Sequence, residues 1–115
     1  MRIMKPDINT RELFRAILLL KTPGECAQFF RDLLTEDEIR EFSERWHVVR
    51  LLNKKLSYRE IQKLTGLSLA TIVRVAKWFK QGEGGYQLIV KRLNKAEEDI
   101  QDPITDTAKD DQPPL

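Results

Sequence analysis

The chain has 115 residues with a single cysteine and a single histidine, and no apolar run approaches the length of a membrane-spanning helix. Cys26 cannot form an internal disulfide, and together with His47 it cannot supply the usual ligand sets for zinc. The segment before Pro6 has no apolar stretch of signal-peptide length, so we expect no secretion. These absences predict a soluble, reduced, cytoplasmic protein without a structural metal or cofactor.

Groups for catalysis are equally scarce. A nucleophile, a base and an acid cannot be assembled from one histidine and one cysteine. The glycine-rich stretch 82–85 lacks the Lys-Ser/Thr pair that follows the glycines of a phosphate-binding loop. The acidic run Glu36 to Glu38 suits the first turn of a helix, whereas a metal needs ligands that converge. The sequence therefore predicts that the chain is not an enzyme.

A confined basic block stands out instead. Residues 45–80 contain nine basic side chains against the single acid Glu60, whereas residues 96–115 contain seven acids and one base. Such a block favours a polyanionic partner. Charge alone does not distinguish this interpretation from a solvated basic face that the acidic segment balances. Because its apolar pattern fades, we expect residues 96–115 to be a disordered acidic tail.

Apolar residues recur at helical spacing, and no segment alternates with the two-residue period of a strand, which predicts an all-α fold. The expected N-caps of the first five helices are Asn9, Thr22, Thr35, Ser57 and Ser68. We expect the third helix to end near Lys54 and a last short helix to carry Tyr86 to Leu93. The expected organisation is an N-terminal arm at residues 1–8 and one helical domain at residues 9–95.

The most informative motif lies at residues 57–80, where two short helices flank a tight turn at Gly66. A glycine permits the left-handed backbone of such a turn, and the arrangement is typical of a helix-turn-helix. The residues expected to pack the two helices together are Ile61, Leu64, Leu67, Ile72 and Val75.

The face of the second helix that this packing leaves exposed is expected to contact DNA. Its first turns are small and uncharged, with Ala70, Thr71 or Val73 near a thymine methyl group. Arg74 and Lys77, further along, can hold phosphates or a guanine. The full set of expected DNA-binding residues is Tyr58, Arg59, Gln62, Ser68, Leu69, Ala70, Thr71, Val73, Arg74 and Lys77.

Three stretches together resemble the Trp repressor superfamily: the Leu-Thr-Glu-Asp-Glu opening at residues 34–38 through Arg45, residues 56–60, and residues 69–74. The resemblance covers about residues 10–93 and is strongest to Trp-repressor-like proteins whose ligand is not established. It implies a six-helix chain that forms an intertwined homodimer, in which the N-terminal helices of one subunit wrap the other. The apolar surface of the first two helices agrees with this, because it exceeds what a thin monomer can cover.

The function that this resemblance implies is a transcription regulator, a repressor that binds a palindromic operator in double-stranded DNA as a dimer. No membrane partner is expected. The alternative interpretation is a helix-turn-helix used for protein interaction or assembly, whose basic face docks an acidic partner. The sequence leaves open the operator sequence and the existence of a small effector.

In the Trp repressor, tryptophan binds between the third helix and the recognition helix, where two arginines and a threonine hold it. The resemblance places Arg45, Arg74 and Thr35 at the matching positions. Val75 and Trp78 stand where the Trp repressor has a glycine and a serine that give the ligand room. We therefore expect a filled remnant of the pocket, no response to tryptophan, and an acidic neighbour for Arg45. The spacing before Ser57 differs by one residue, so residues 53–56 are not matched.

Overall fold

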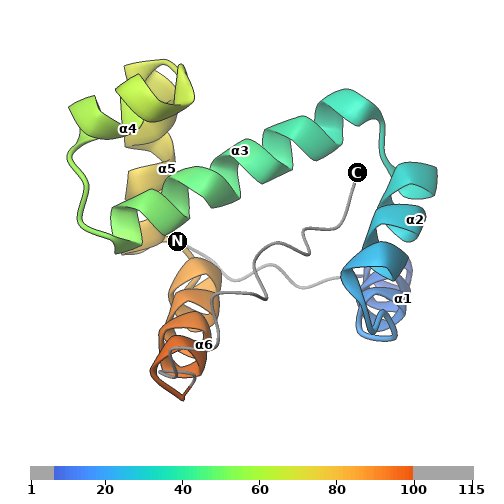
Figure 1. Ribbon diagram of the computed structural model, residues 1–115. Coiled ribbons are helices and arrows are strands. Elements are labelled where there is room, and N and C mark those ends of the chain that lie inside the picture. The colour runs from blue at the N-terminus through green and yellow to red at the C-terminus, as the bar shows by residue number, and fades with distance from the viewer. Residues whose placement is uncertain (1–6, 100–115) are drawn as a thin grey trace. The chain divides into compact units, whose positions relative to one another are not determined.

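The computed structural model describes residues 7–99, and this part of the chain forms six α-helices and no strand (Figure 1). The helices are α1 (Ile8–Ile17), α2 (Pro23–Leu33), α3 (Glu36–Asn53), α4 (Tyr58–Thr65), α5 (Leu69–Gln81) and α6 (Gly85–Asp99). The prediction of an all-α, six-helix chain is confirmed for these residues. None of the helices in this part of the chain is long and apolar enough to cross a membrane.

The helix ends follow the sequence with two differences. Asp7 is the N-cap of α1 because its carboxylate accepts the amide of Thr10 at 2.8 Å, so the prediction of Asn9 was wrong. This hydrogen bond holds the pKa of Asp7 below its ordinary value. At the other end, α6 continues past Lys95 to Asp99, because alanine and glutamate at the intervening positions are strong helix formers. Residues 1–6 of the expected arm and 100–115 of the expected tail lie outside the described residues.

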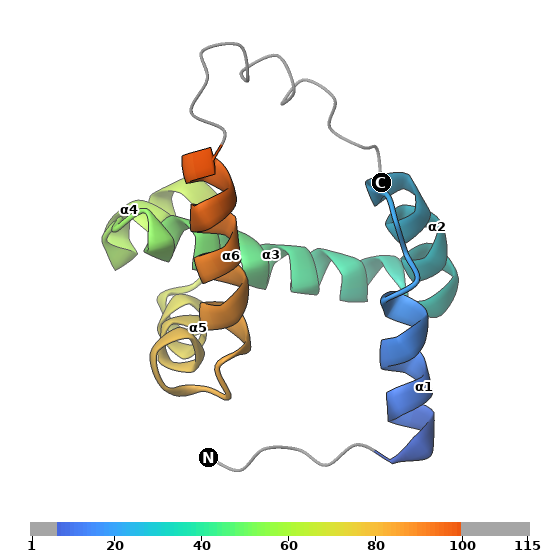
Figure 2. The same ribbon diagram turned by 90° about the horizontal axis from the view of Figure 1, so that it is seen from below.

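The described chain divides into an N-terminal unit, residues 7–39, and a C-terminal unit, residues 40–99. The N-terminal unit contains α1, α2 and the first residues of α3, which follow one another in both ribbon views (Figures 1 and 2). None of its residues is buried. Phe14 of α1 and Leu33 of α2 are 46% and 45% exposed, and Leu18 and Leu19, which follow α1, are 82% and 75% exposed. The apolar side chains of the unit therefore lack cover within it.

The C-terminal unit contains the core, where α4 packs on α5 and α5 packs on α6 next to the end of α3 (Figure 2). Its buried side chains are Val48, Val49, Leu51, Ile61, Ile72, Val75, Ala76 and Val90. The side-chain amides of Asn53 and Asn94 also join α3 to α6, with 2.9 Å between Asn53 Nδ2 and Asn94 Oδ1.

One packing prediction was wrong. Leu64 is 65% exposed, whereas Ile61 is completely buried against α5. The two residues lie about 60° apart around α4, and a helix of this length offers α5 only a narrow face. That face is filled by Ile61, which leaves Leu64 in solvent.

Candidate nucleic-acid interface

The turn between α4 and α5 depends on the backbone of Gly66. Its φ of 75° lies in the left-handed region, and its amide donates to the carbonyl of Gln62 at 2.9 Å. A Cβ at this position would meet no atom within 4 Å, so the backbone conformation alone requires the glycine. Ile61 and Ile72, both fully buried, then fix α4 against α5. The predicted pair of short helices with a tight turn is present.

A capping box starts α4, and it includes Glu60, the single acidic residue of the basic block at residues 45–80. The Ser57 amide donates to Glu60 Oε1 at 2.8 Å, and the Glu60 amide donates to Ser57 Oγ at 3.1 Å. The hydrogen bond from the Ser57 amide, and after it the Ser57 side chain, lower the pKa of the Glu60 carboxyl. The carboxylate is therefore ionised at neutral pH and held at the helix start.

An exposed stripe runs along α5, and we call Leu69, Ala70, Val73, Arg74 and Lys77 the α5 stripe. These positions are spaced by one, three and four residues, which places them on one helical face. The apolar members come first: Leu69 is 49% exposed and Val73 is 45% exposed. The two cations follow toward the C-terminal end of the helix.

The hydroxyl groups of Ser68 and Thr71 form hydrogen bonds at the start of α5. Ser68 Oγ accepts the amide of Thr71 at 3.1 Å and lies 2.9 Å from Thr71 Oγ1. The two side chains thus hydrogen-bond to each other and to the first turn of the helix. They define where α5 begins and which face the α5 stripe presents.

Of the ten residues expected to contact DNA, eight are exposed, and Tyr58 and Thr71 are half-buried. The Tyr58 ring packs against the core, and Lys80 Nζ lies 5.9 Å from the ring centroid and 3.5 Å from the hydroxyl. Tyr58 therefore supports the core at the start of α4. Lys80 was missed by the sequence prediction, since no local pattern relates residues 22 positions apart.

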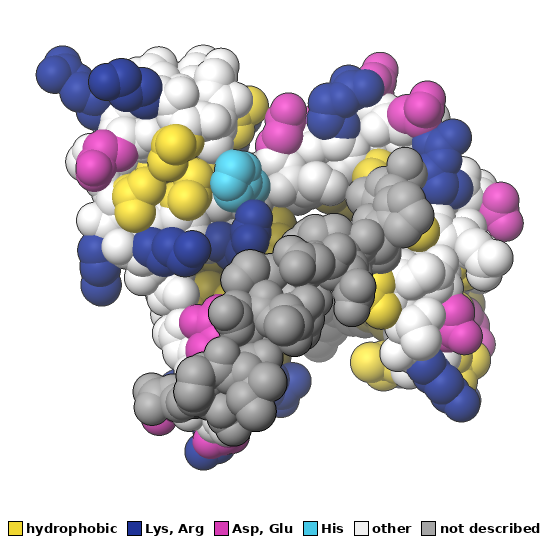
Figure 3. Space-filling view, viewed as in Figure 1, with side chains coloured by type: hydrophobic (Ala, Val, Ile, Leu, Met, Phe, Trp, Pro, Cys, Tyr) yellow, Lys and Arg dark blue, Asp and Glu magenta, His cyan; other side chains and the backbone are white. Residues whose placement is uncertain are grey.

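Basic charge is concentrated in the C-terminal unit. Residues 40–99 contain 13 basic and seven acidic side chains, whereas residues 7–39 contain four and seven. Several Lys and Arg side chains lie over α4 and the neighbouring end of α3 (Figure 3). The exposed residues of the α5 stripe thus belong to the unit that carries the positive charge.

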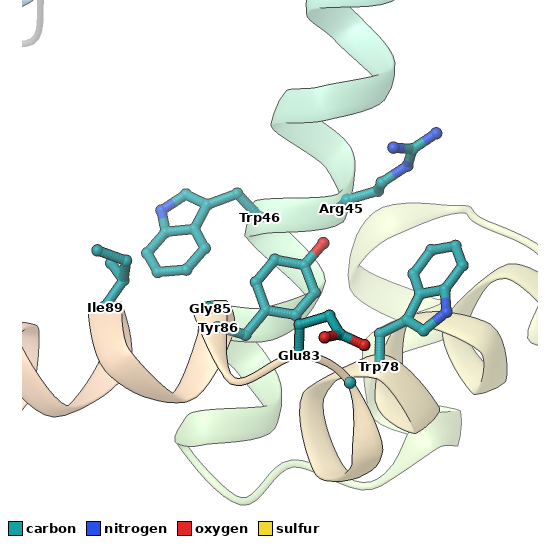
Figure 4. A pocket seen from close by; sticks show the side chains of 8 residues that line it. Arg45, Trp46, Trp78, Glu83, Gly85, Tyr86 and Ile89 are labelled. Carbon is teal, nitrogen blue, oxygen red and sulfur yellow. The ribbon is translucent and has the colours of Figure 1, made fainter. Parts of the chain in front are cut away.

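A second feature of the C-terminal unit is an open hollow of about 600 Å³ between α3, the end of α5 and the start of α6 (Figure 4). It is lined by Arg45, Trp46, Trp78, Gly82, Glu83, Gly85, Tyr86 and Ile89. The Trp46 and Tyr86 rings are tilted against each other, with 6.5 Å between their centroids. The guanidinium carbon of Arg45 lies 5.5 Å from the centroid of the Phe42 ring, where an acidic neighbour was expected.

The structure brings together two of the five residues that the resemblance placed in a ligand pocket. Arg45 and Trp78 line the hollow, and Trp78 forms part of its wall without filling it. Val75 is buried in the core, and Arg74 is exposed on the α5 stripe. Thr35 caps α3 in the N-terminal unit, where its hydroxyl accepts the amide of Glu38 at 3.1 Å. The hollow therefore shares Arg45 and Trp78 with the expected pocket, and the expectation of a filled pocket stays a prediction.

The tryptophan and tyrosine walls of the hollow were recognisable in part. Tyr86 lies on the last helix that the sequence predicted, and both Tyr86 and Trp46 are half-buried against the core. Nothing in the sequence indicated Glu83, which lies in the connection between α5 and α6. Within residues 7–99, no three His, Cys, Asp or Glu side chains are grouped so that they could hold a metal ion.

The two helices, their left-handed turn and the exposed α5 stripe define a helix-turn-helix protein of the DNA-binding class. The chain belongs to the Trp repressor protein family, whose family model matches residues 9–94. This is a family of DNA-binding regulators, as the resemblance of the sequence implied.

Individual relatives agree with this assignment. The chain is 38% identical over 86 residues to the uncharacterized protein YerC of Bacillus subtilis (strain 168), a match that covers 75% of this chain and 83% of YerC. A TrpR-like protein from Eubacterium eligens ATCC 27750 has a similar crystal structure, with a TM-score of 0.71, 38% identity and coverage of 75% and 89% of the two chains. For a Trp repressor candidate from Staphylococcus aureus, the TM-score is 0.73 at 38% identity, with 77% and 89% covered.

Proposed function

We propose that this protein is a dimeric, cytoplasmic transcription repressor without enzymatic activity, which binds a palindromic operator in double-stranded DNA. The observation that carries this proposal is the α5 stripe, an exposed recognition face on a helix-turn-helix within the basic unit. Arg74 and Lys77 supply cations for phosphates or a guanine at one end of this face. Arg59, exposed on the first turn of α4, is positioned for the DNA backbone.

The dimer is supported by the apolar surface of the N-terminal unit. Leu18 and Leu19 are largely exposed, and Phe14 and Leu33 of the neighbouring helices are 46% and 45% exposed. Exposure of this much apolar surface to water is unfavourable. A second copy of the chain supplies a matching apolar face through a two-fold axis. The two copies of α5 then enter successive major grooves about one helical turn (~34 Å) apart, which is why we expect a palindrome.

We infer that tryptophan is not the effector. The side chain of Val75 occupies the core at a position where the Trp repressor has glycine, and Trp78 presents an indole where it has serine. Both side chains take space that the ligand uses there. A rise of several degrees in the melting temperature at millimolar tryptophan would contradict this inference, because a ligand that binds the folded state stabilises it.

Selection of binding sites from random duplex DNA at physiological salt tests the function. A palindrome with half-sites about one turn apart is the expected result. Retained DNA without a common sequence would mean that the protein contacts only phosphates. If no DNA is retained, the proposal is wrong, and the helix-turn-helix serves protein interaction or assembly.

The contribution of Arg74 can be measured on the selected site. Arg74→Ala is expected to weaken specific binding by about 1–3 kcal/mol if the side chain contacts a base. If it contacts a phosphate, the slope of log affinity against log salt falls by about one. Arg92→Ala is the matched control, since Arg92 is an exposed arginine on α6. Equal effects of the two substitutions would remove Arg74 from the interface.

A further inference from the structure

We propose that the first two turns of α5 recognise thymine methyl groups, so that each operator half-site carries A·T pairs where Leu69, Ala70 and Val73 meet the major groove. The inference depends on the proposed DNA-binding function and adds to it the class of base that the helix selects. Apolar residues then contribute to specificity at these base pairs, and the cations of the same stripe contact a phosphate or a guanine further along.

The shape of the surface supports this assignment. Leu69 and Val73 lie four residues apart and therefore adjoin on one face of α5, with 49% and 45% of their surfaces exposed. Ala70 is exposed beside them. Residues 68–73 include no charged side chain, so this part of the helix can approach base edges without bringing an unpaired charge into the groove.

The polar groups nearby are already used. The hydroxyls of Ser68 and Thr71 lie 2.9 Å apart, and Ser68 Oγ also accepts the Thr71 amide. No asparagine or glutamine, which would pair with adenine in two hydrogen bonds, stands within residues 68–73. Leu69, Ala70 and Val73, the exposed side chains beside these hydroxyls, offer apolar contact alone.

In the major groove, the apolar group that distinguishes one base pair from another is the C5 methyl of thymine. An exposed leucine and valine gain free energy by covering it, because both apolar surfaces leave water. Arg74 begins the cationic half of the stripe one turn after Ala70, so contacts with guanine or phosphate are expected further along the same half-site.

Replacement of thymine by uracil tests the proposal, because it removes the methyl group and leaves the base pair intact. On the selected operator, each thymine of a half-site is replaced in turn by 2′-deoxyuridine, and the dissociation constant of the full-length protein is measured. We expect about fourfold weaker binding at one or two positions per half-site, which corresponds to about 0.8 kcal/mol for a buried methyl group. Placing 5-methylcytosine instead of cytosine at the same position should recover part of the lost affinity.

Variants of the protein connect the methyl group to the side chain. In Val73→Ala or Leu69→Ala, the ratio between uracil and thymine duplexes should fall toward one at the position that the side chain covers. Lys77→Ala is the matched control on the same stripe, and it should weaken both duplexes equally and preserve the ratio. Because Leu69 and Val73 are about half exposed, these substitutions leave the core in place, which a thermal melt checks.

Two outcomes would overturn the inference while the function stands. The selected site could lack thymine opposite α5, or uracil duplexes could bind as tightly as thymine duplexes at every position. If Leu69→Ala and Val73→Ala instead weaken self-association and leave the uracil ratio unchanged, the apolar residues form a protein contact and the proposal is wrong. Absence of any bound DNA would refute the proposed function as well, which separates the two failures.

Discussion

The C-terminal unit buries eight hydrophobic residues from four helices, whereas in the N-terminal unit no residue is buried although its helices are just as amphipathic. Four elements that pack against one another can enclose a core. Two helices and one helix end cannot, so Leu18 and Leu19 remain in solvent. The difference indicates that residues 40–99 are stabilised by their own contacts, while the apolar faces of residues 7–39 have no cover within their own unit.

The two units also differ in charge. The C-terminal unit has 13 basic side chains against seven acidic ones, and the N-terminal unit has four against seven. Positive charge attracts DNA but repels a second basic surface. An apolar unit without excess positive charge is therefore suited to bring two copies together, and the basic unit is suited to DNA.

The largest expected effect comes from a substitution in the core of the C-terminal unit. Ile72→Ala should lower the free energy of unfolding by about 2–5 kcal/mol, because Ile72 is fully buried and the truncation leaves a cavity. Val73→Ala, at the next position of α5, removes an exposed side chain and should cost much less. Urea unfolding followed by circular dichroism measures both. Similar costs for the two variants would mean that α5 faces another way.

The next effect concerns the N-terminal unit and its expected partner copy. Leu18→Ser combined with Leu19→Ser should weaken the dimer by about 2 kcal/mol, or nearly 30-fold, since the apolar area that the second copy covers is reduced. Sedimentation equilibrium measures the change. Gln28→Ser, at an exposed polar position of α2, is the control and should change the association little. An unaltered dimer in the double variant would place the interface elsewhere.

The same difference between the units decides what the sequence could predict. Helical spacing predicted that Ile61, Ile72 and Val75 would be packed inside, and all three are buried. Their partners lie on neighbouring elements that short connections bring together. In α1 and α2, the same spacing marks an apolar stripe, but none of its residues is buried within the N-terminal unit. The hydrophobic pattern of one sequence therefore predicts the apolar face of a helix better than it predicts the surface that packs against that face.

The candidate site shows a similar division. Gly66, Ser57 and Ser68 lie where short-range turn and cap chemistry places them, and this chemistry operates over about four residues. Lys80 beside Tyr58 and Glu83 at the hollow were not predicted, because they depend on how α5 crosses α4 and α6. The exposure of Leu64 was missed for the same reason, because the neighbouring helix decides how much of an apolar face is buried.

A smaller effect compares one motif in both units. At the start of α2, Thr22 Oγ1 accepts the amide of Glu25, just as Ser57 Oγ accepts the amide of Glu60 at the start of α4. Ser57→Ala should lower the free energy of unfolding by about 1 kcal/mol, because the amide of Glu60 loses its acceptor. Thr22→Ala is the matched variant in the N-terminal unit, and its cost should vary with protein concentration if that unit folds by association. Urea midpoints at two protein concentrations measure both.

The capping box of α4 also carries a pH dependence. Hydrogen bonds with Ser57 lower the pKa of Glu60 in the folded state, so the folded state favours the ionised carboxylate. Its stabilisation is complete above the ordinary glutamate pKa and is lost as the pH falls through the lowered folded-state pKa. Glutamine has no carboxyl group to protonate, so Glu60→Gln should lose less unfolding free energy than the parent chain as the pH falls. Urea unfolding curves at a series of pH values measure this difference. An identical acid profile for the variant and the parent chain would contradict the assignment.

The smallest expected effect lies at Lys55, in the connection between α3 and α4. Its φ of 68° makes it the one left-handed residue other than glycine among residues 7–99, and, like Gly66 and Gly84, it belongs to the C-terminal unit. Lys55→Gly relieves a strain of about 1 kcal/mol but adds flexibility to the unfolded chain, so the net change should stay within about 0.5 kcal/mol. Lys54→Gly removes the same charge at a position without positive φ and should therefore be less stable than Lys55→Gly by about 1 kcal/mol. If the two glycine variants unfold at the same urea concentration, the backbone of Lys55 is not strained. Packing of the C-terminal core would then impose no strain on the connection between α3 and α4.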